Sequence, residues 1–83
     1  MNNSSVTQQV ALRRQLPSPD ECRRIRVSAG VSLREMARQL RVSDTAVLQW
    51  ETGRTKPNAP HLRAYVSLLA ELRGMLNDGP PAT

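Results

Sequence analysis

Three serines divide the middle of the chain into short helical segments, and these helix-start signals constrain the fold more than any other feature. Ser18 and Ser32 each precede an acidic residue by three positions, which is the capping-box signature of a helix start. Ser43 is a good cap for a third segment. Gly30 and Gly53 stand where the first and third segments end, and glycine is the usual residue at a left-handed helix stop. The pattern predicts three short helices in close succession.

Apolar residues recur at helical spacing in these segments, and the stretch from Pro60 onward predicts a longer amphipathic helix. With 83 residues and few aromatic side chains, the chain has room for one small core, which helices around a shared centre build most easily. No strand pattern is present. The sequence therefore predicts an all-α fold, a compact domain of four to five helices. The expected inward-facing residues are Cys22, Ile25, Ala29, Leu33, Met36, Ala37, Leu40, Ala46, Val47, Trp50, Leu62, Tyr65 or Val66, Leu69, Leu72 and Leu76.

Three parts of the chain are expected. Val6 to Leu16 has only loose helical spacing and ends at Pro17, so residues 1–17 predict a flexible segment or a marginal helix. Residues 18–76 contain the patterned helices and predict the folded domain. Residues 77–83 are rich in glycine and proline and predict a disordered tail.

Twelve basic residues against seven acidic ones give the chain a net charge of +5. This charge favours nucleic-acid binding without deciding it, because solubility alone could also account for it. The single cysteine, Cys22, allows no internal disulfide, and no apolar run approaches a membrane span. We therefore expect a cytoplasmic, nucleoid-associated protein with no membrane partner.

Catalysis has little support in the sequence. Cys22 and His61 are the only soft metal ligands besides the methionines, and two scattered ligands do not make a zinc site. No Ser/His/Asp arrangement, glycine-rich phosphate loop or pair of carboxylates is apparent. We expect no enzymatic activity, no cofactor, no metal and no small-molecule ligand.

The stretch from Gly30 to Gly53 predicts a helix-turn-helix, because two helices this short are stable only when packed together. Ala37 is small at the point where the two helix axes would meet. Residues 30–37, Val42-Ser43, Val47 and residues 50–57 together resemble the Cro/CI type of helix-turn-helix, the XRE family. The resemblance covers roughly residues 23–72. It implies a lambda-repressor-like five-helix fold that binds a double-stranded DNA operator, usually as a dimer on a two-fold symmetric site.

The same resemblance implies an ion pair between Arg26 and Glu51. Glu51 follows the expected core residue Trp50, and a buried carboxylate without a partner is costly. The alternative for Arg26 is a solvated surface arginine. The pair is expected to join the recognition helix to the first helix rather than to contact bases.

Residues on the outer face of the third segment are the candidates for base contacts. Gln49 can bond adenine, and Thr45 can meet a thymine methyl group or a phosphate. Two roles stay open for Leu48: a contact with a thymine methyl group, or an incidental position on the surface. For Asp44, a role at the helix N-terminus is weighed slightly above a contact with a cytosine amino group. The full set of base-contacting candidates is Ser43, Asp44, Thr45, Leu48 and Gln49.

Phosphate contacts are expected from the helix start, the turn and the following loop. Leu33 would contribute its backbone amide at the helix N-terminus. It stands where the family usually has glutamine, so the contact of that side chain is lost. Arg41 replaces the family's usual glycine in the turn, where a left-handed arginine costs on the order of 1 kcal/mol. Either the turn differs or a phosphate compensates for that cost. The full set of phosphate-contacting candidates is Leu33, Arg34, Arg41, Thr52, Arg54 and Lys56.

Two functions are consistent with these residues. The first is a sequence-specific transcriptional regulator, and the compact size favours a small repressor of the kind that phages, prophages and plasmids encode. A homodimer is expected, because one module reads few bases. Leu68, Leu72 and Leu76 in the last helix are its candidate surface, unless they only cover the core and the N-terminal segment. The second function is an antitoxin or transcription adaptor that binds a protein through residues 6–16 or the last helix, which an acidic Asp44 mildly favours.

Overall fold

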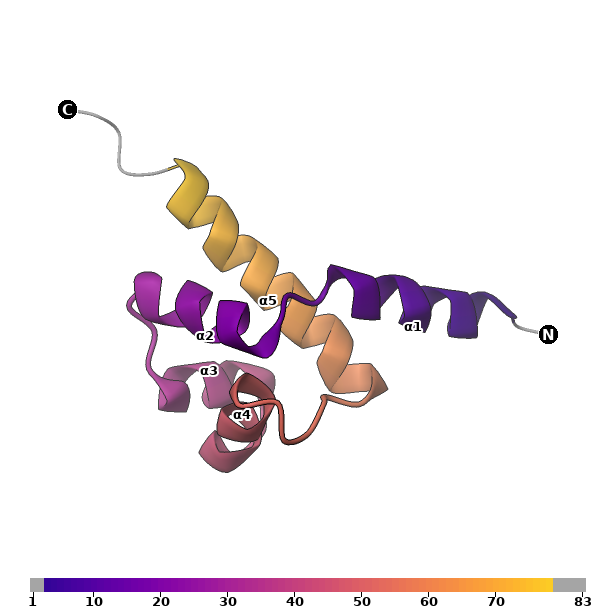
Figure 1. Ribbon diagram of the computed structural model, residues 1–83, viewed down its shortest axis with the longest axis horizontal. Coiled ribbons are helices and arrows are strands. Elements are labelled where there is room, and N and C mark those ends of the chain that lie inside the picture. Colours follow the sequence, from indigo (N-terminus) through magenta and orange to yellow (C-terminus); the bar gives the residue numbers. More distant parts are fainter. Residues whose placement is uncertain (1–2, 79–83) are drawn as a thin grey trace.

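The computed structural model describes residues 3–78, which form five α-helices and contain no strand. The expectation of an all-α domain with four to five helices is confirmed. Figure 1 shows α2, α3 and α4 gathered on one side of α5, while α1 projects away from them. The bounds are α1 Asn3–Gln15, α2 Pro19–Ser28, α3 Leu33–Leu40, α4 Asp44–Glu51 and α5 Ala59–Asp78.

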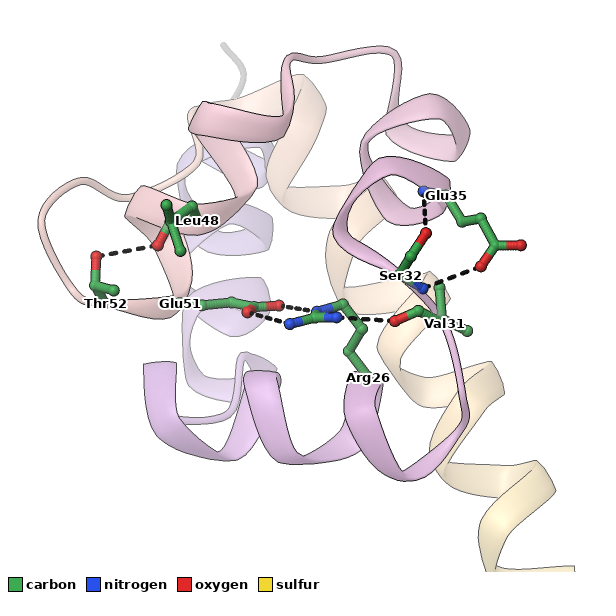
Figure 2. Close-up of polar contacts among 7 residues, drawn as sticks. All are labelled: Arg26, Val31, Ser32, Glu35, Leu48, Glu51 and Thr52. Carbon is green, nitrogen blue, oxygen red and sulfur yellow. Dashed lines mark hydrogen bonds and ion pairs between the residues drawn. The ribbon is translucent and has the colours of Figure 1, made fainter.

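The three serines cap the helices that they were predicted to open. The Ser18 hydroxyl accepts a hydrogen bond from the Glu21 amide at 3.2 Å, and the Ser43 hydroxyl accepts one from the Ala46 amide at 3.1 Å. At α3 the capping box is complete. The Glu35 amide donates to the Ser32 hydroxyl, and the Ser32 amide donates to the Glu35 carboxylate, both at 3.0 Å (Figure 2). These bonds satisfy amides that a helix start leaves without partners.

Helices α2, α3 and α4 end in the same left-handed turn. The residues with positive φ are Gly30 at +75°, Arg41 at +59° and Gly53 at +79°. In each turn the next amide reaches back five residues to a helix carbonyl, as in a Schellman motif. These bonds run from Val31 to Arg26, from Val42 to Ala37 and from Arg54 to Gln49, at 3.1, 3.0 and 2.9 Å. Arg41 therefore adopts the conformation that glycine would favour, and the turn is not altered.

The core forms where α2, α3, α4 and α5 meet. Met36 and Val47 are fully buried, and Ala37 is 1% exposed between α3 and α4, so a small residue at that position lets the two helices approach closely. Most of the predicted inward-facing residues are buried. Three of them are partly exposed but still pack on the core, namely Ala29, Leu33 and Ala46, and one, Leu76, is exposed.

The two ends of the chain differ from the sequence-based expectation. α1 is a continuous helix from Asn3, longer than the marginal helix expected over residues 6–16, and its contacts with α5 compensate for a weak apolar stripe. α5 continues through Gly74 to Asp78, two residues past the expected boundary at residue 76. One glycine costs a helix about 1 kcal/mol, which does not end a helix anchored by its buried leucines. Residues 79–83 of the expected tail lie outside the described residues.

A buried ion pair joins α2 to the end of α4. The Arg26 Nε and Nη2 atoms donate to the two carboxylate oxygens of Glu51 at 2.7 and 3.0 Å (Figure 2). The third donor, Nη1, reaches the Val31 carbonyl at 2.8 Å in the turn before α3. The Glu51 side chain is 1% exposed and that of Arg26 is 10% exposed, so the implied pair is confirmed and a solvated Arg26 is excluded. One guanidinium thus connects α2, the α2–α3 turn and α4.

We expect Arg26→Met to lower the free energy of unfolding by about 3–5 kcal/mol, because it leaves the buried Glu51 carboxylate without a counter-charge. Urea unfolding followed by circular dichroism measures this loss. The double variant Arg26→Met/Glu51→Leu should be more stable than Arg26→Met alone, since no charge then stays buried. Additive losses in the double variant would contradict this interpretation of the pair.

We expect Arg41→Gly to raise the free energy of unfolding by about 0.5–1 kcal/mol, because glycine removes the left-handed strain at a smaller cost in unfolded-chain entropy. The midpoint of thermal unfolding should rise by a few degrees. Arg38→Gly is the matched control. It removes the same side chain from the last turn of α3, where φ is helical, and should lower stability by about 1 kcal/mol. A loss in both variants would contradict the strain at Arg41.

Candidate nucleic-acid interface

Helices α3 and α4 form the predicted helix-turn-helix, joined by a turn of three residues, 41–43. Eight residues make α4 about 12 Å long, a length that fits across the major groove of B-DNA. Its inward face is held by Val47 and Trp50, and the Trp50 ring lies tilted against Tyr65 with 5.0 Å between centroids. The opposite face of α4 is left to solvent.

The N-terminus of α4 offers a group of hydrogen-bond donors. The first two helical amides, Asp44 and Thr45, donate to no acceptor among the residues that the structure describes. The Ser43 hydroxyl accepts from the Ala46 amide, which leaves its own proton for an external acceptor. Ser43, Asp44 and Thr45 are all exposed. This end of the helix therefore combines free donors with the positive end of a helix dipole.

Arg34 and Asp44 bring the N-termini of α3 and α4 together. The Arg34 Nε and an Asp44 carboxylate oxygen lie 4.0 Å apart, and both side chains are more than half exposed. An exposed pair at this distance adds little stability, but it offsets part of the acidic charge beside α4. The sequence pattern did not indicate this pairing, because the two residues are ten positions apart across a turn and share no helical periodicity.

The outer face of α4 carries Leu48 and Gln49. Leu48 is 46% exposed, and Gln49 is half-buried. The Gln49 side-chain amide bonds no protein group in the described part of the chain, while its backbone carbonyl accepts from the amides of Arg54 and Thr55 at 2.9 and 3.4 Å. The loop after α4 is thus tied to the same residue whose side chain is a candidate base reader.

The phosphate-contacting candidates divide into two groups around α4. Leu33 and Arg34 occupy the first turn of α3, and their amides find no acceptor in residues 3–78. Arg54 and Lys56 are exposed in the loop after α4, and neither forms an ion pair with a described residue. A cation pair and a helix N-terminus flanking one exposed helix can contact the two sides of a groove.

Two further candidates lie less favourably. The Thr52 hydroxyl directs its single proton at the Leu48 carbonyl at 3.0 Å (Figure 2) and at the Gln49 carbonyl at 3.2 Å. Its side chain therefore serves the end of α4. Arg41 lines a shallow depression on α3 together with Glu35 and Arg38, and none of the other phosphate-contacting candidates lines it.

Cys22 and His61 make separate local contacts. The Cys22 thiol donates to the Pro17 carbonyl at 3.5 Å, and burial raises its pKa, which keeps the thiol protonated and disfavours a nucleophilic role. His61 bonds the Asn58 side chain at 2.9 Å and lies beside Trp50. Residues 3–78 contain no group of three His, Cys, Asp or Glu side chains placed to hold a metal ion.

The comparisons with known proteins bear on the helices just described. A family model for a helix-turn-helix domain matches residues 20–75, which include α2 except its first residue, all of α3 and α4, and most of α5, but not α1. No curated protein and no solved structure matches the chain significantly. Within the described range, no helix has both the length and the apolarity needed to cross a bilayer. The match covers most of the chain and is consistent with the resemblance to the Cro/CI type. The chain therefore belongs to a helix-turn-helix domain family, and its domain indicates DNA binding and transcription regulation.

Proposed function

We propose that the protein is a sequence-specific transcriptional repressor that inserts α4 into the major groove of duplex DNA. One observation carries the proposal: the exposed face of α4 is flanked by free amides at the start of α3 and by unpaired cations in the following loop. Base-reading groups on a helix bounded by phosphate-binding groups are the parts that a helix-turn-helix needs.

Each side chain on the outer face of α4 has a distinct role in this proposal. Gln49 forms two hydrogen bonds with an adenine edge, and Thr45 and Leu48 contact thymine methyl groups. Asp44 accepts a hydrogen bond from a cytosine amino group, and Arg34 at 4.0 Å offsets the repulsion that its carboxylate would exert on nearby phosphates. Because Arg34 offsets this charge, the acidic Asp44 is a weaker reason to favour a protein-binding function.

Phosphate binding supplies the affinity that all sequences share. Arg54 and Lys56 contact the backbone on one side of α4, and the Leu33 and Arg34 amides contact it on the other. Each phosphate neutralised by a cation releases condensed counterions, so binding should weaken steeply as salt rises. This common affinity is separate from the base contacts, which decide the preferred sequence.

A second candidate function rests on α1, which lies outside the matched residues and exposes Val6 by 65% and Val10 by 44%. These valines favour an antitoxin or adaptor that binds a partner protein. Fluorescence anisotropy with labelled genomic duplex at rising salt separates the two functions. A repressor shows a tight selected site and a steep salt dependence, whereas an adaptor shows neither.

We expect Gln49→Ala to weaken binding to the preferred duplex by about 1–3 kcal/mol and to leave binding to random duplex nearly unchanged, because the lost contacts are to a base edge. The preferred duplex is obtained by selecting bound sites from a random pool. Anisotropy titrations of the wild type and of Gln49→Ala on both duplexes give the four affinities that the comparison needs.

Arg54→Ala is the counterpart of that variant, and it should weaken both duplexes alike and flatten the salt slope by about one unit. Arg24→Ala serves as the control, since Arg24 lies on α2 and pairs with Asp20 and Glu21. Unchanged DNA binding in both Gln49→Ala and Arg54→Ala would overturn the proposed function.

Dimerisation through the end of α5 also forms part of the proposal, with a revised surface. Leu72 is 8% exposed and belongs to the core, so it is not free to contact a partner. Leu68 packs against the core and stays partly exposed. The exposed apolar residues at this end are Met75 and Leu76. Figure 1 shows the end of α5 extending beyond α2. Joining two copies here would place two recognition helices on one symmetric operator.

Equilibrium sedimentation at micromolar concentration should show a dimer, and Leu76→Asp should shift it toward monomer, because the carboxylate would be buried in an apolar contact. Leu76 is exposed within one chain, so circular dichroism of the variant should match that of the wild type. A monomer at every concentration, with and without operator duplex, would contradict this surface.

A further inference from the structure

The C-terminal end of α1 and the loop that follows the recognition helix line the same cavity. Arg13, from the last turn of α1, lines one cavity together with Thr55 and Lys56 of the loop, and with Gly53 at the end of α4. Residues 13 and 56 are far apart in the sequence, and the matched family begins only at residue 20. The tertiary structure therefore adds a cation to the loop from outside the helix-turn-helix domain.

Both segments that meet at this cavity are entirely basic in charge. α1 and the loop over residues 52–58 contain no aspartate or glutamate, and between them they hold the four cations Arg13, Arg14, Arg54 and Lys56. None of these four forms an ion pair with a residue that the structure describes. Cations gathered without acids create a positive potential that attracts phosphates.

The acids of α2 and α4 have other partners. Asp20 and Glu21 at the start of α2 face Arg24, and Glu21 also lies 3.5 Å from Arg73. Glu51, the acid nearest in sequence to the loop, is buried against Arg26. The acids of α2 and α4 thus face other cations, and neither Arg13 nor Lys56 pairs with an acid among residues 3–78. A phosphate can therefore serve as their counter-charge.

The position of α1 is held by packing, so Arg13 is presented at a defined place. Leu16 continues the last turn of α1, with its amide donating to the Leu12 carbonyl at 3.1 Å, and it packs against the core. α1 also contacts α5. A helix of 13 residues would be marginal alone, and these contacts stabilise it where its last turn meets the loop.

The helix dipole gives a simpler reason for basic residues in this turn, because cations are favourable at any helix C-terminus. That reason applies equally to Arg13 and Arg14, which both lie in the last turn. Only Arg13 lines the cavity beside Lys56. The dipole therefore accounts for the presence of two arginines but not for the placement of one of them at the loop.

We infer that Arg13 binds a DNA backbone phosphate next to those bound by Arg54 and Lys56, so that α1 extends the contact with duplex DNA beyond the helix-turn-helix. This inference rests on the proposed function. Residues that precede the matched domain would then contribute to the affinity for DNA that does not depend on its sequence. Arg13 has no part in base recognition, since phosphates carry no direct sequence information.

The test compares Arg13→Gln with Arg14→Gln, which remove the same charge from the same helix turn. Each full-length variant is titrated by anisotropy on a random-sequence duplex and on the selected duplex, between about 50 and 200 mM salt. Arg13→Gln should weaken both duplexes by the same factor and flatten the salt slope by about 0.9, the value for one lost phosphate contact. Arg14→Gln should keep the wild-type slope, and Arg13→Lys should restore it.

Several outcomes would overturn the inference. If Arg13→Gln and wild type had equal salt slopes, Arg13 would not contact a phosphate. If both glutamine variants changed the slope equally, the effect would come from net charge alone. Circular dichroism of each variant checks that α1 is intact, and a slope that stays flattened in Arg13→Lys would also count against the contact. If wild type and Arg54→Ala bind DNA as expected while Arg13→Gln matches wild type, only this inference fails. If wild type binds neither duplex, the proposed function fails first.

Discussion

The bidentate ion pair between Arg26 and Glu51 is the interaction on which the placement of the recognition helix depends. Its guanidinium bonds the last residue of α4 and, through the Val31 carbonyl, the turn that leads into α3. Two helices of eight residues have little stability of their own, so their orientation must come from contacts with the rest of the domain. A buried charge pair with three directed hydrogen bonds defines an orientation more narrowly than apolar packing, which tolerates rearrangement.

With α4 held from its inner face, its outer face can carry functional groups that the core does not need. Ser43, Asp44, Thr45 and Leu48 are exposed, and the first two amides of α3 and of α4 have no acceptors in the described residues. Donors left without protein partners at two neighbouring helix starts, beside cations in the next loop, suit a polyanion better than a small ligand. The same division explains why Thr52, whose hydroxyl serves the end of α4, is a weaker phosphate candidate than Arg54.

Much of this arrangement could be predicted from local signals. The capping serines, the stops at Gly30 and Gly53 and the apolar spacing of α3 each depend on residues within one turn, so the helices between residues 18 and 53 were predicted close to their observed bounds. Prediction was poorer where tertiary contacts compete with local preference. α1 has a weak stripe but packs on α5. For Leu72 the sequence left a dimer surface and the core as alternatives, and the structure places it in the core. Periodicity shows that a side chain faces inward, but it does not show which neighbour covers it.

The sequence by itself determined the fold class, the position of the helix-turn-helix and the residues that face outward from its second helix, because caps, stops and helical period act over a few residues. Only the tertiary structure decided which charges meet. It placed Arg34 beside Asp44 across the turn, and it placed Arg13 of α1 at the cavity that Lys56 of the loop after α4 also lines. Electrostatic interactions depend on distance in space and not on separation along the chain. The chain's net charge favoured a polyanionic partner without deciding it, whereas the packing of α1 brought Arg13 to the cavity that Lys56 lines.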